Sequence, residues 1–369
     1  MVQQRIGRRA ARRAATAGVL GGLGLLLSGC ASNTGNKWID QTLNFGFPTG
    51  VTPNAEHLRG FWTGTVVTSL IVGVFVWGLI FWSMAFHRKR KGDDEFPRQT
   101  GYNVPLELVY TAVPFLVISV LFYFTVLAEN RMVDLRPEDE IGVRVDVTGY
   151  QWNWKFGYNH VDVPGASIAD GTNQEAQKAA EEASTLSEEE RKALGHDGEE
   201  AAGGPIHGKL ASDLSYLHYN KMETVGTSEE VPVLVLPTDT RVEFRLAAAD
   251  VIHSFWVPEF IYKLDVMPNP AKNQQLNMFQ IESIDREGAF VGRCAEMCGT
   301  YHAMMNFEIR AVSPQDFAKY IQFRQANPGA TNADALKSIG QEPYATSTSP
   351  FKTGRTDTRD QANVTASTN

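Results

Sequence analysis

Cysteine is scarce in this chain, which has only three among its 369 residues. Three cysteines are too few to build a disulfide scaffold. The chain also lacks a positive net charge, and its formal charge of −8 argues against nucleic acid as a partner. No C-x-x-C-H sequence occurs, so the chain attaches no c-type haem of its own.

Two long stretches lack acidic and basic residues altogether. Neither the stretch 60–86 nor the stretch 108–128 contains any Asp, Glu, Lys or Arg. A helix of about 20 apolar residues crosses the hydrocarbon core of a bilayer. We therefore expect two transmembrane helices that form a hairpin, with Pro114 bending the second helix without breaking it.

Basic residues indicate the orientation of this hairpin. The cluster His-Arg-Lys-Arg-Lys at 87–91 directly follows the first helix, and such clusters mark the cytoplasmic side of a membrane. The connecting loop, 87–103, is then cytoplasmic, and the chain after Glu129 is extracytoplasmic. Together with the bacterial type of export signal described next, this orientation predicts the plasma membrane of a bacterium.

The stretch 1–29 has the pattern of an export signal. Arginines between positions 5 and 13 precede an apolar stretch at 17–27. The sequence Leu-Ser-Gly-Cys at 27–30 then resembles the lipobox of bacterial lipoproteins, in which the chain is cut before the cysteine and its thiol is lipidated. Cys30 is therefore the expected lipidation site. The alternative is an uncut signal anchor with an incidental cysteine.

From residue 141 the sequence changes to a period of two. Valines at 143, 145 and 147 alternate with polar residues, which predicts a half-buried strand. Further strand patterns cover 231–236, 242–246, 275–281, 290–294 and 307–312. Short strands separated by turn residues predict a β-sandwich or a Greek-key barrel.

An acidic segment interrupts these strands. Residues 161–230 hold 15 acidic and 5 basic residues, so the segment is either a solvated loop or a docking surface for a partner protein. Within it, 174–194 is expected to be helical, with Ser187 as a cap ahead of three glutamates. After the last strand we expect a short amphipathic helix at 314–326 and a disordered polar tail from 327 onward.

Metal-ligand residues gather between the last two expected strands. Residues 294–305 read Cys-Ala-Glu-Met-Cys-Gly-Thr-Tyr-His-Ala-Met-Met. Thiolate, imidazole and thioether ligands together favour copper over magnesium or calcium. A mononuclear blue-copper site uses one cysteine, so the two thiolates of Cys294 and Cys298 point instead to two copper ions that they bridge.

The other ligands divide evenly between two ions. His302 and the upstream His253 each supply a terminal imidazole, Met305 is a weak ligand to one ion, and the backbone carbonyl of Glu296 is available to the other. This even count favours a dinuclear centre. Two alternatives use fewer of these residues, namely a disulfide between the two cysteines and a Cys2His2 zinc site.

Three motifs make the chain similar to subunit II of the haem-copper cytochrome c oxidases. They are the ligand stretch 294–305, Asp-Val-Ile-His-Ser-Phe at 250–255, and Tyr-Gln-Trp-Asn-Trp at 150–154. The resemblance implies a cupredoxin-like domain on a two-helix anchor and a dinuclear copper A (CuA) centre. That centre accepts electrons from cytochrome c and passes them to haem a in subunit I, which reduces oxygen to water and pumps protons.

The resemblance also implies roles for single residues. Trp152 matches the residue through which electrons enter from cytochrome c, and Glu107 matches a glutamate at the mouth of a proton channel. The Glu296 carboxylate matches a ligand of a magnesium ion at the border with subunit I. Tyr150 departs from the family pattern, which usually has histidine there; this concerns the contact with the donor and not the copper.

The acidic segment resembles that of the longer subunits II of actinobacteria, whose oxidase associates with a cytochrome bc complex. The donor would then be a membrane-bound c-type cytochrome in a bc-oxidase supercomplex, and Asp250 would add to an acidic docking face. The other expected partners are the remaining oxidase subunits. The chain is an enzyme only within that complex, because it contains no haem-ligating pattern of its own.

The expected fold class is a membrane-anchored all-β protein, with a two-helix transmembrane hairpin followed by a cupredoxin-like Greek-key β-barrel. The expected domains are a signal peptide at 1–29, an extracytoplasmic segment at 30–59, the hairpin at 60–129, the copper domain with its insertion at 130–313, and a helix and tail at 314–369. Two other functions compete with this one. They are a quinol oxidase subunit II, whose copper-free relatives lack the ligands present here, and a lipid-anchored copper-binding or copper-delivery protein.

Overall fold

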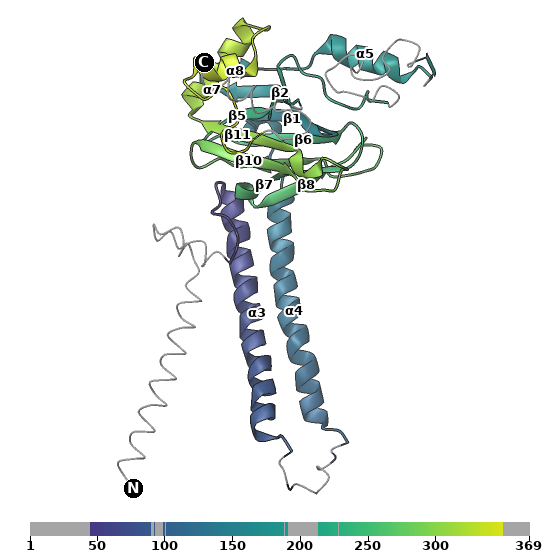
Figure 1. The fold of residues 1–369 in the computed structure, drawn as a ribbon, viewed down its shortest axis with the longest axis vertical. Helices are drawn as coiled ribbons and strands as arrows, with labels where there is room; N and C mark the ends of the chain where they lie inside the picture. Colours follow the sequence, from purple (N-terminus) through teal and green to yellow (C-terminus); the bar gives the residue numbers. More distant parts are fainter. Residues whose placement is uncertain are drawn as a thin grey trace, which may run out of the picture. The chain divides into compact units, whose positions relative to one another are not determined.

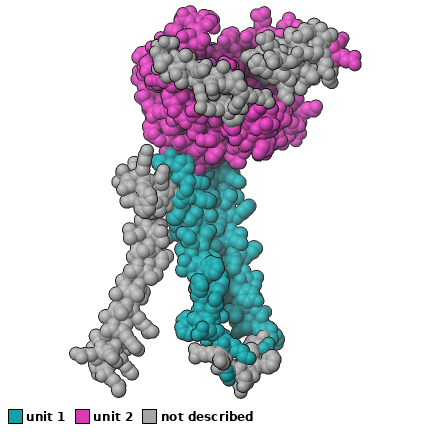
Figure 2. All heavy atoms as spheres, in the orientation of Figure 1, with its two compact units in different colours: residues 1–49, 56–131 teal, residues 50–55, 132–369 magenta. Residues whose placement is uncertain are grey.

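The computed structural model of the chain describes residues 45–89, 92, 99, 101–187, 189–190, 213–227 and 229–349 (Figure 1). The chain divides into two compact units, one formed by residues up to 49 and 56–131, the other by 50–55 and the residues from 132 onward (Figure 2). The export signal, Cys30 and the chain beyond 349 lie outside the described residues. Their assignments therefore stay predictions.

Two long helices make up the first unit. They are α3 (Pro53–Phe86) and α4 (Val104–Val133), and both are long and apolar enough to cross a membrane. Their large apolar side chains are mostly exposed, as lipid-facing side chains are expected to be. As predicted, α4 continues through Pro114 without a break.

The second unit contains two β-sheets. The first has the strand order β3-β2-β1-β6-β9, with β4 also paired to β2, and the second has the order β5-β11-β10-β7-β8. The strands of the first sheet are β1 (Val143–Tyr150), β2 (Asn153–Val163), β3 (Ala166–Ile168), β4 (Glu223–Val225), β6 (Val242–Ala248) and β9 (Met278–Ile281). Those of the second are β5 (Val233–Pro237), β7 (His253–Val257), β8 (Tyr262–Val266), β10 (Gly288–Cys294) and β11 (Asn306–Val312).

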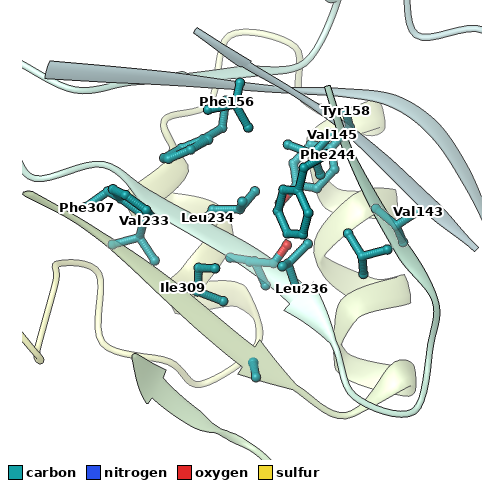
Figure 3. Packing of buried hydrophobic residues seen from close by; sticks show 14 of the residues in the cluster. Val143, Val145, Phe156, Tyr158, Val233, Leu234, Leu236, Phe244, Phe307 and Ile309 are labelled. Atoms are coloured by element: carbon teal, nitrogen blue, oxygen red, sulfur yellow. The ribbon is translucent and has the colours of Figure 1, made fainter. Parts of the chain in front are cut away.

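Apolar side chains from both sheets meet in one core. Figure 3 shows Val145 and Phe156 from the first sheet close to Leu234, Phe307 and Ile309 from the second. Burying each side chain of this size contributes about 1.5–3 kcal/mol to folding. The strands predicted from alternating residues thus form a two-sheet sandwich in which β1–β6 and β5–β11 are parallel pairs, and the predicted fold class is confirmed.

The prediction that β1 is half-buried is wrong, because both of its faces are buried. Asp146, on the face opposite the valines, accepts hydrogen bonds from Arg245 (Nε to Oδ1, 2.7 Å) and from Asn220 (Nδ2 to Oδ2, 2.9 Å). On the neighbouring strand the buried Lys155 pairs with Glu223 at 2.9 Å. Asn220 and Glu223 belong to the predicted acidic segment, which therefore covers this face as an additional layer.

The acidic segment differs from the prediction in its ends and in its helix. Its first residues lie in β2, which extends to Val163, and its later part includes β4, which pairs with β2. The helix α5 (Gln174–Ser184) ends within the predicted 174–194, residues 189–190 are helical again, and 191–194 lie outside the described residues. Helix α5 ends where Ser184 and Thr185 turn their hydroxyl groups onto carbonyls of their own helix. Ser187 does exchange capping hydrogen bonds with Glu190, as its sequence predicted.

The C-terminal region is ordered further than predicted. Helix α7 (Pro314–Ala326) confirms the expected helix, with Ser313 as its N-cap. The predicted disorder from 327 is wrong up to 349, since α8 (Asn332–Ser338) follows with Leu336 fully buried. The buried Glu308 carboxylate then accepts hydrogen bonds from the backbone of Thr346 and Ser347, which fixes the chain against β11.

Candidate metal centre

The predicted ligand stretch forms a loop between two paired strands. Cys294 is the last residue of β10, and β11 begins at Asn306. The two ends of the loop are joined, because Cys294 N–H donates to the carbonyl of Met305 at 3.1 Å. Trp154 donates its indole N–H to the same carbonyl at 3.2 Å. The loop is therefore held at both ends by the sandwich.

The sulfur atoms of the two cysteines lie 3.8 Å apart. Both cysteines are buried and free, so the disulfide alternative is not what the structure shows. Strand β7 brings the distant histidine to them: it pairs with β10 so that Phe255 lies opposite Cys294, two residues after His253. Gly149 of β1 leaves room for this ring, since a Cβ atom there would lie 3.0 Å from its Cδ2.

The other candidate ligands divide between the two sulfur atoms. His253 Nδ1 lies 3.8 Å from Cys294 Sγ, and the Glu296 carbonyl oxygen lies 3.3 Å from it. His302 Nδ1 lies 3.6 Å from Cys298 Sγ, and Met305 Sδ lies 3.9 Å from it. Each thiol thus has one imidazole and one weaker donor on its own side.

The ligand atoms of His253, Cys294 and Cys298 all lie within 4.8 Å of one another. All three residues are buried, as is Met305, whereas His302 is half-buried. The side chain of Glu296 is exposed, although its carbonyl faces the cysteines. Two soft sulfur atoms flanked by two imidazole nitrogens, a thioether and a carbonyl are a donor set that suits copper.

A buried carboxylate orients the upstream histidine. Asp250 Oδ1 lies 2.8 Å from His253 Nε2, which leaves Nδ1 to face the cysteines. Burial lowers the pKa of His253, but its hydrogen bonds with Asp250 and Cys294 outweigh burial and raise that pKa. The side chain of Asp250 is only 1% exposed. The suggestion that Asp250 belongs to a docking face is therefore wrong.

The thiols of Cys294 and Cys298 differ in their pKa values. A hydrogen bond with Cys298 lowers the pKa of Cys294 to about 3, helped by hydrogen bonds from His253 and from backbone groups. The same bond raises the pKa of Cys298. One hydrogen bond explains both pKa shifts. The Cys298 thiol donates to the Cys294 thiolate and stabilises it, and the same bond keeps Cys298 protonated.

The residue predicted to receive electrons lies against this loop. Trp152 is partly buried, and its indole Nε1 donates to the carbonyl of Cys298 at 3.2 Å. Its ring also meets the ring of Tyr301 edge-on, with 4.9 Å between the centroids. A partly exposed indole is thus in direct contact with the backbone of a candidate ligand.

The other predicted residues have contacts of their own. Glu107 stands in the first turn of α4, in the first unit, where its carboxylate accepts a hydrogen bond from Asn103 N–H. Tyr150 is buried, and its hydroxyl donates to the carbonyl of Gly226 at 2.5 Å. It therefore ties β1 to the acidic segment. Met304 is half-buried beside Met305.

Sequence reasoning missed the roles of two polar residues at the site. Gln151 donates its side-chain Nε2 to the carbonyl of Cys298 at 2.7 Å, and its backbone N–H donates to Asp250 Oδ2 at 2.7 Å. The role of Asp250 could have been found from the rule that a metal-binding histidine gives its second nitrogen to a carboxylate. Nothing in the sequence around Gln151 indicates a contact 147 residues away.

Known proteins share this sequence closely. The family described as cytochrome C oxidase subunit II, periplasmic domain, matches residues 213–312. A probable cytochrome c oxidase subunit 2 of Nocardia farcinica is 55% identical over 94% of this chain and 90% of its own length. The cytochrome c oxidase subunit 2 of Mycobacterium tuberculosis is 51% identical over 94% of this chain and 91% of its own. That of Corynebacterium diphtheriae is 50% identical over 98% of both chains.

Among solved structures, the periplasmic domain of subunit II of cytochrome oxidase of Bradyrhizobium japonicum has 22% identity and a TM-score of 0.29 over 52% of this chain and 99% of its own. The relatives above carry the assignment, because about half of their residues are identical over nearly the whole length. The chain belongs to the cytochrome c oxidase subunit 2 family, as its copper-ligand motif predicted.

Proposed function

We propose that this chain is the subunit of cytochrome c oxidase that accepts electrons at a dinuclear copper (CuA) centre and passes them to haem a in subunit I. One observation carries the proposal: two thiol sulfur atoms 3.8 Å apart, each with an imidazole Nδ1 within 3.8 Å on its own side. Cys294 and Cys298 would bridge the ions, with His253 and Glu296 O on one side and His302 and Met305 on the other.

The chain's own residues prepare this centre in two ways. When bound, the copper pair supplies a one-electron carrier whose charge is shared between two ions. The sandwich shields His253 and Met305 from water, since they are 0% and 1% exposed. Asp250 holds His253 with Nδ1 toward the cysteines. A copper bridge would need both thiols deprotonated, so copper binding would release their protons.

The alternative of a copper-delivery protein fits the site less well. Delivery requires ligands that a partner can reach and exchange. Here Cys298 is 2% exposed and Met305 is 1% exposed, and β10 and β11 brace both ends of the loop. The zinc alternative leaves Met305 Sδ and the Glu296 carbonyl beside the sulfur atoms without a use.

Glu296 is also our candidate for the magnesium ligand at the border with subunit I. Its carbonyl faces Cys294 while its side chain is exposed, so the carbonyl could serve copper while the carboxylate serves magnesium. Replacing magnesium with manganese in the oxidase and recording the manganese EPR signal tests this. The signal should be lost in Glu296→Gln and retained in Thr300→Ala; an unchanged signal in Glu296→Gln contradicts the assignment.

Trp152→Phe should slow electron transfer from the donor by at least about tenfold, a barrier increase of about 1.4 kcal/mol, while both copper ions are retained. The indole is partly exposed and touches the Cys298 carbonyl, so it forms a short path from the surface. Stopped-flow reduction by the donor, beside copper analysis, measures both quantities. Gln151 still holds the carbonyl in this variant. Loss of copper would show instead that Trp152 is structural.

We propose that a c-type cytochrome, membrane-bound within a bc-oxidase supercomplex, is the donor, and that the acidic segment contacts it. The described part of that segment exposes Glu175, Glu181 and Glu182 on α5. The small apolar cluster around Leu217 and Tyr219 packs the segment onto the first sheet, so the positions of these glutamates are fixed. Carboxylates held in this way are complementary to a positively charged partner.

Reversing the charge of those three glutamates to lysine should weaken the oxidase–bc association and make the remaining activity less sensitive to salt. Co-purification of the two complexes at rising ionic strength measures this. Converting Lys319 and Lys337, exposed on α7 and α8, to glutamate is the control. Equal association in both variants contradicts docking at α5.

We further propose that α3 and α4 span the plasma membrane of a bacterium, that Cys30 is lipidated after cleavage of residues 1–29, and that Glu107 serves proton uptake. Mass spectrometry of the mature N-terminus tests lipidation, and an intact signal or a free thiol at Cys30 contradicts it.

For the proton role, Glu107→Gln should slow turnover while CuA reduction stays normal. Unchanged turnover contradicts that role.

A further inference from the structure

We infer that Gln151 is a positioning residue of the metal centre, which fixes the bridging Cys298 relative to the terminal ligand His253. The inference rests on the proposed function, because it assumes that these two residues bind the copper pair. Gln151 lies in the turn between β1 and β2. Its hydrogen bonds reach the backbone of one ligand and the carboxylate partner of the other, so it acts on the metal through both.

The first contact of Gln151 is with the ligand loop. Its Nε2 donates to the Cys298 carbonyl at 2.7 Å, a shorter bond than the 3.2 Å one from the Trp152 indole to the same oxygen. The next residue, Gly299, has φ +122°. A Cβ atom there would lie 3.1 Å from Trp152 Nε1 and 3.2 Å from Gln151 Nε2. The loop backbone thus closes tightly against both donors, which only glycine allows in this conformation.

The second contact of Gln151 is with the partner of the other ligand. Its backbone N–H donates to Asp250 Oδ2 at 2.7 Å, and Asp250 Oδ1 bonds His253 Nε2 at 2.8 Å. Both carboxylate oxygens of Asp250 are therefore engaged, one by the backbone of Gln151 and the other by His253.

These contacts form one continuous path from Cys298 through Gln151 and Asp250 to His253. The path matters because the ligands come from separate elements, the β10–β11 loop and the start of β7. A two-ion centre shares its charge evenly only while both ions keep matching surroundings, and functional geometry of this kind must be held to about 0.5 Å. Gln151 connects the two sides of the centre, with its side chain on the loop and its backbone on Asp250.

The test uses the intact oxidase with Gln151→Leu, which removes the side-chain donor and keeps the backbone bond to Asp250. Gln177→Leu is the matched control, since Gln177 also donates Nε2 to a backbone carbonyl, that of Ser215 at 2.9 Å, within the acidic segment. We expect Gln151→Leu to keep two copper ions per chain but to alter the hyperfine pattern of the mixed-valence EPR signal. Copper release to a chelator should be about three- to tenfold faster, the factor expected for one hydrogen bond. Gln177→Leu should match the wild type.

A double-mutant cycle measures the coupling between Gln151 and Trp152 in the rate of copper release, which a general loss of stability would not produce. Gln151 and Trp152 share one acceptor, so each single variant leaves the Cys298 carbonyl with one of these two donors. The combination with Trp152→Phe removes both and should exceed the product of the two single effects on release. Should Gln151→Leu not assemble, Gln151→Glu keeps the shape, lacks the donor and carries the same expectations.

Three outcomes overturn the inference. They are a Gln151→Leu signal and release rate equal to those of the wild type, equal changes in Gln151→Leu and Gln177→Leu, and strictly multiplicative effects in the cycle. A wild-type oxidase without any mixed-valence copper signal refutes the proposed function itself. The two failures are therefore distinguishable.

Discussion

Cys294→Ser should abolish the two-copper signal and reduce oxidation of the native donor to below about 1% of the wild-type rate, because loss of even an outer partner of a metal ligand costs about 10–100-fold. A serine hydroxyl stays protonated at neutral pH and is a hard oxygen donor, so it cannot replace a bridging thiolate. The sulfur lies 3.8 Å from the second thiol and 3.8 Å from His253 Nδ1. Its removal therefore breaks the contact of both ions with that side.

The measurement combines copper analysis, EPR and oxygen consumption by the purified oxidase. Met304→Leu is the matched control, because Met304 adjoins Met305 in the same loop while Met305 Sδ is the thioether that lies beside Cys298. It should keep both copper ions and near-normal turnover. A Cys294→Ser oxidase that retains a charge-sharing copper pair would contradict the assignment of Cys294 as a bridge.

Asp250→Asn should weaken copper retention by about 10–100-fold, the range for a second partner of a metal-binding histidine. Asp250 uses both oxygens as acceptors, Oδ1 for His253 and Oδ2 for the Gln151 backbone. Asparagine has one oxygen and one NH2 group. Either the His253 ring N–H or the Gln151 backbone N–H would then face the NH2 group of asparagine, which is also a donor. As a result, His253 would turn or the bond to Gln151 would be lost.

Competition between the oxidase and a copper chelator measures this retention. Asp170→Asn is the control: Asp170 also accepts with both oxygens, from Thr172 N–H and from Gln174, but it lies in the acidic segment. Equal copper retention in the two variants would show that Asp250 does not orient His253. A loss of copper retention in Asp250→Asn alone supports the conclusion that Asp250 orients His253.

The candidate ligands could be grouped from the sequence because most of them are local. Cys294, Cys298, His302 and Met305 follow one another in a single loop, so their spacing carries the chemistry. Even the distant His253 stands in a recognisable motif. The two long helices were equally clear, since a long uncharged apolar stretch matches the thickness of the hydrocarbon core of a bilayer.

The remaining features depend on contacts between distant residues. Gln151 reaches Cys298 across 147 residues, and Glu308 reaches Ser347 across 39. The polar, threonine-rich sequence after 327 has a disordered composition, yet a buried carboxylate on β11 gives its backbone a partner. In the same way, the polar face of β1 has the sequence pattern of a strand exposed to solvent. It is buried because a layer from the distant acidic segment covers it.

Short strands also escaped the period-two pattern. Strands β3 and β4 are three residues long, which is too short to show alternation. Strand β7 has buried residues on both faces, with only Trp256 partly exposed, so its sequence does not alternate either. Its position was nevertheless decisive, because pairing with β10 places His253 next to Cys294.

The most direct test of the copper assignment is the copper content and EPR spectrum of the purified full-length chain loaded with copper. We predict two copper ions per chain and one unpaired electron shared by both, because two thiols 3.8 Å apart are each flanked by an imidazole. One copper ion per chain with the hyperfine pattern of a single nucleus would contradict the account.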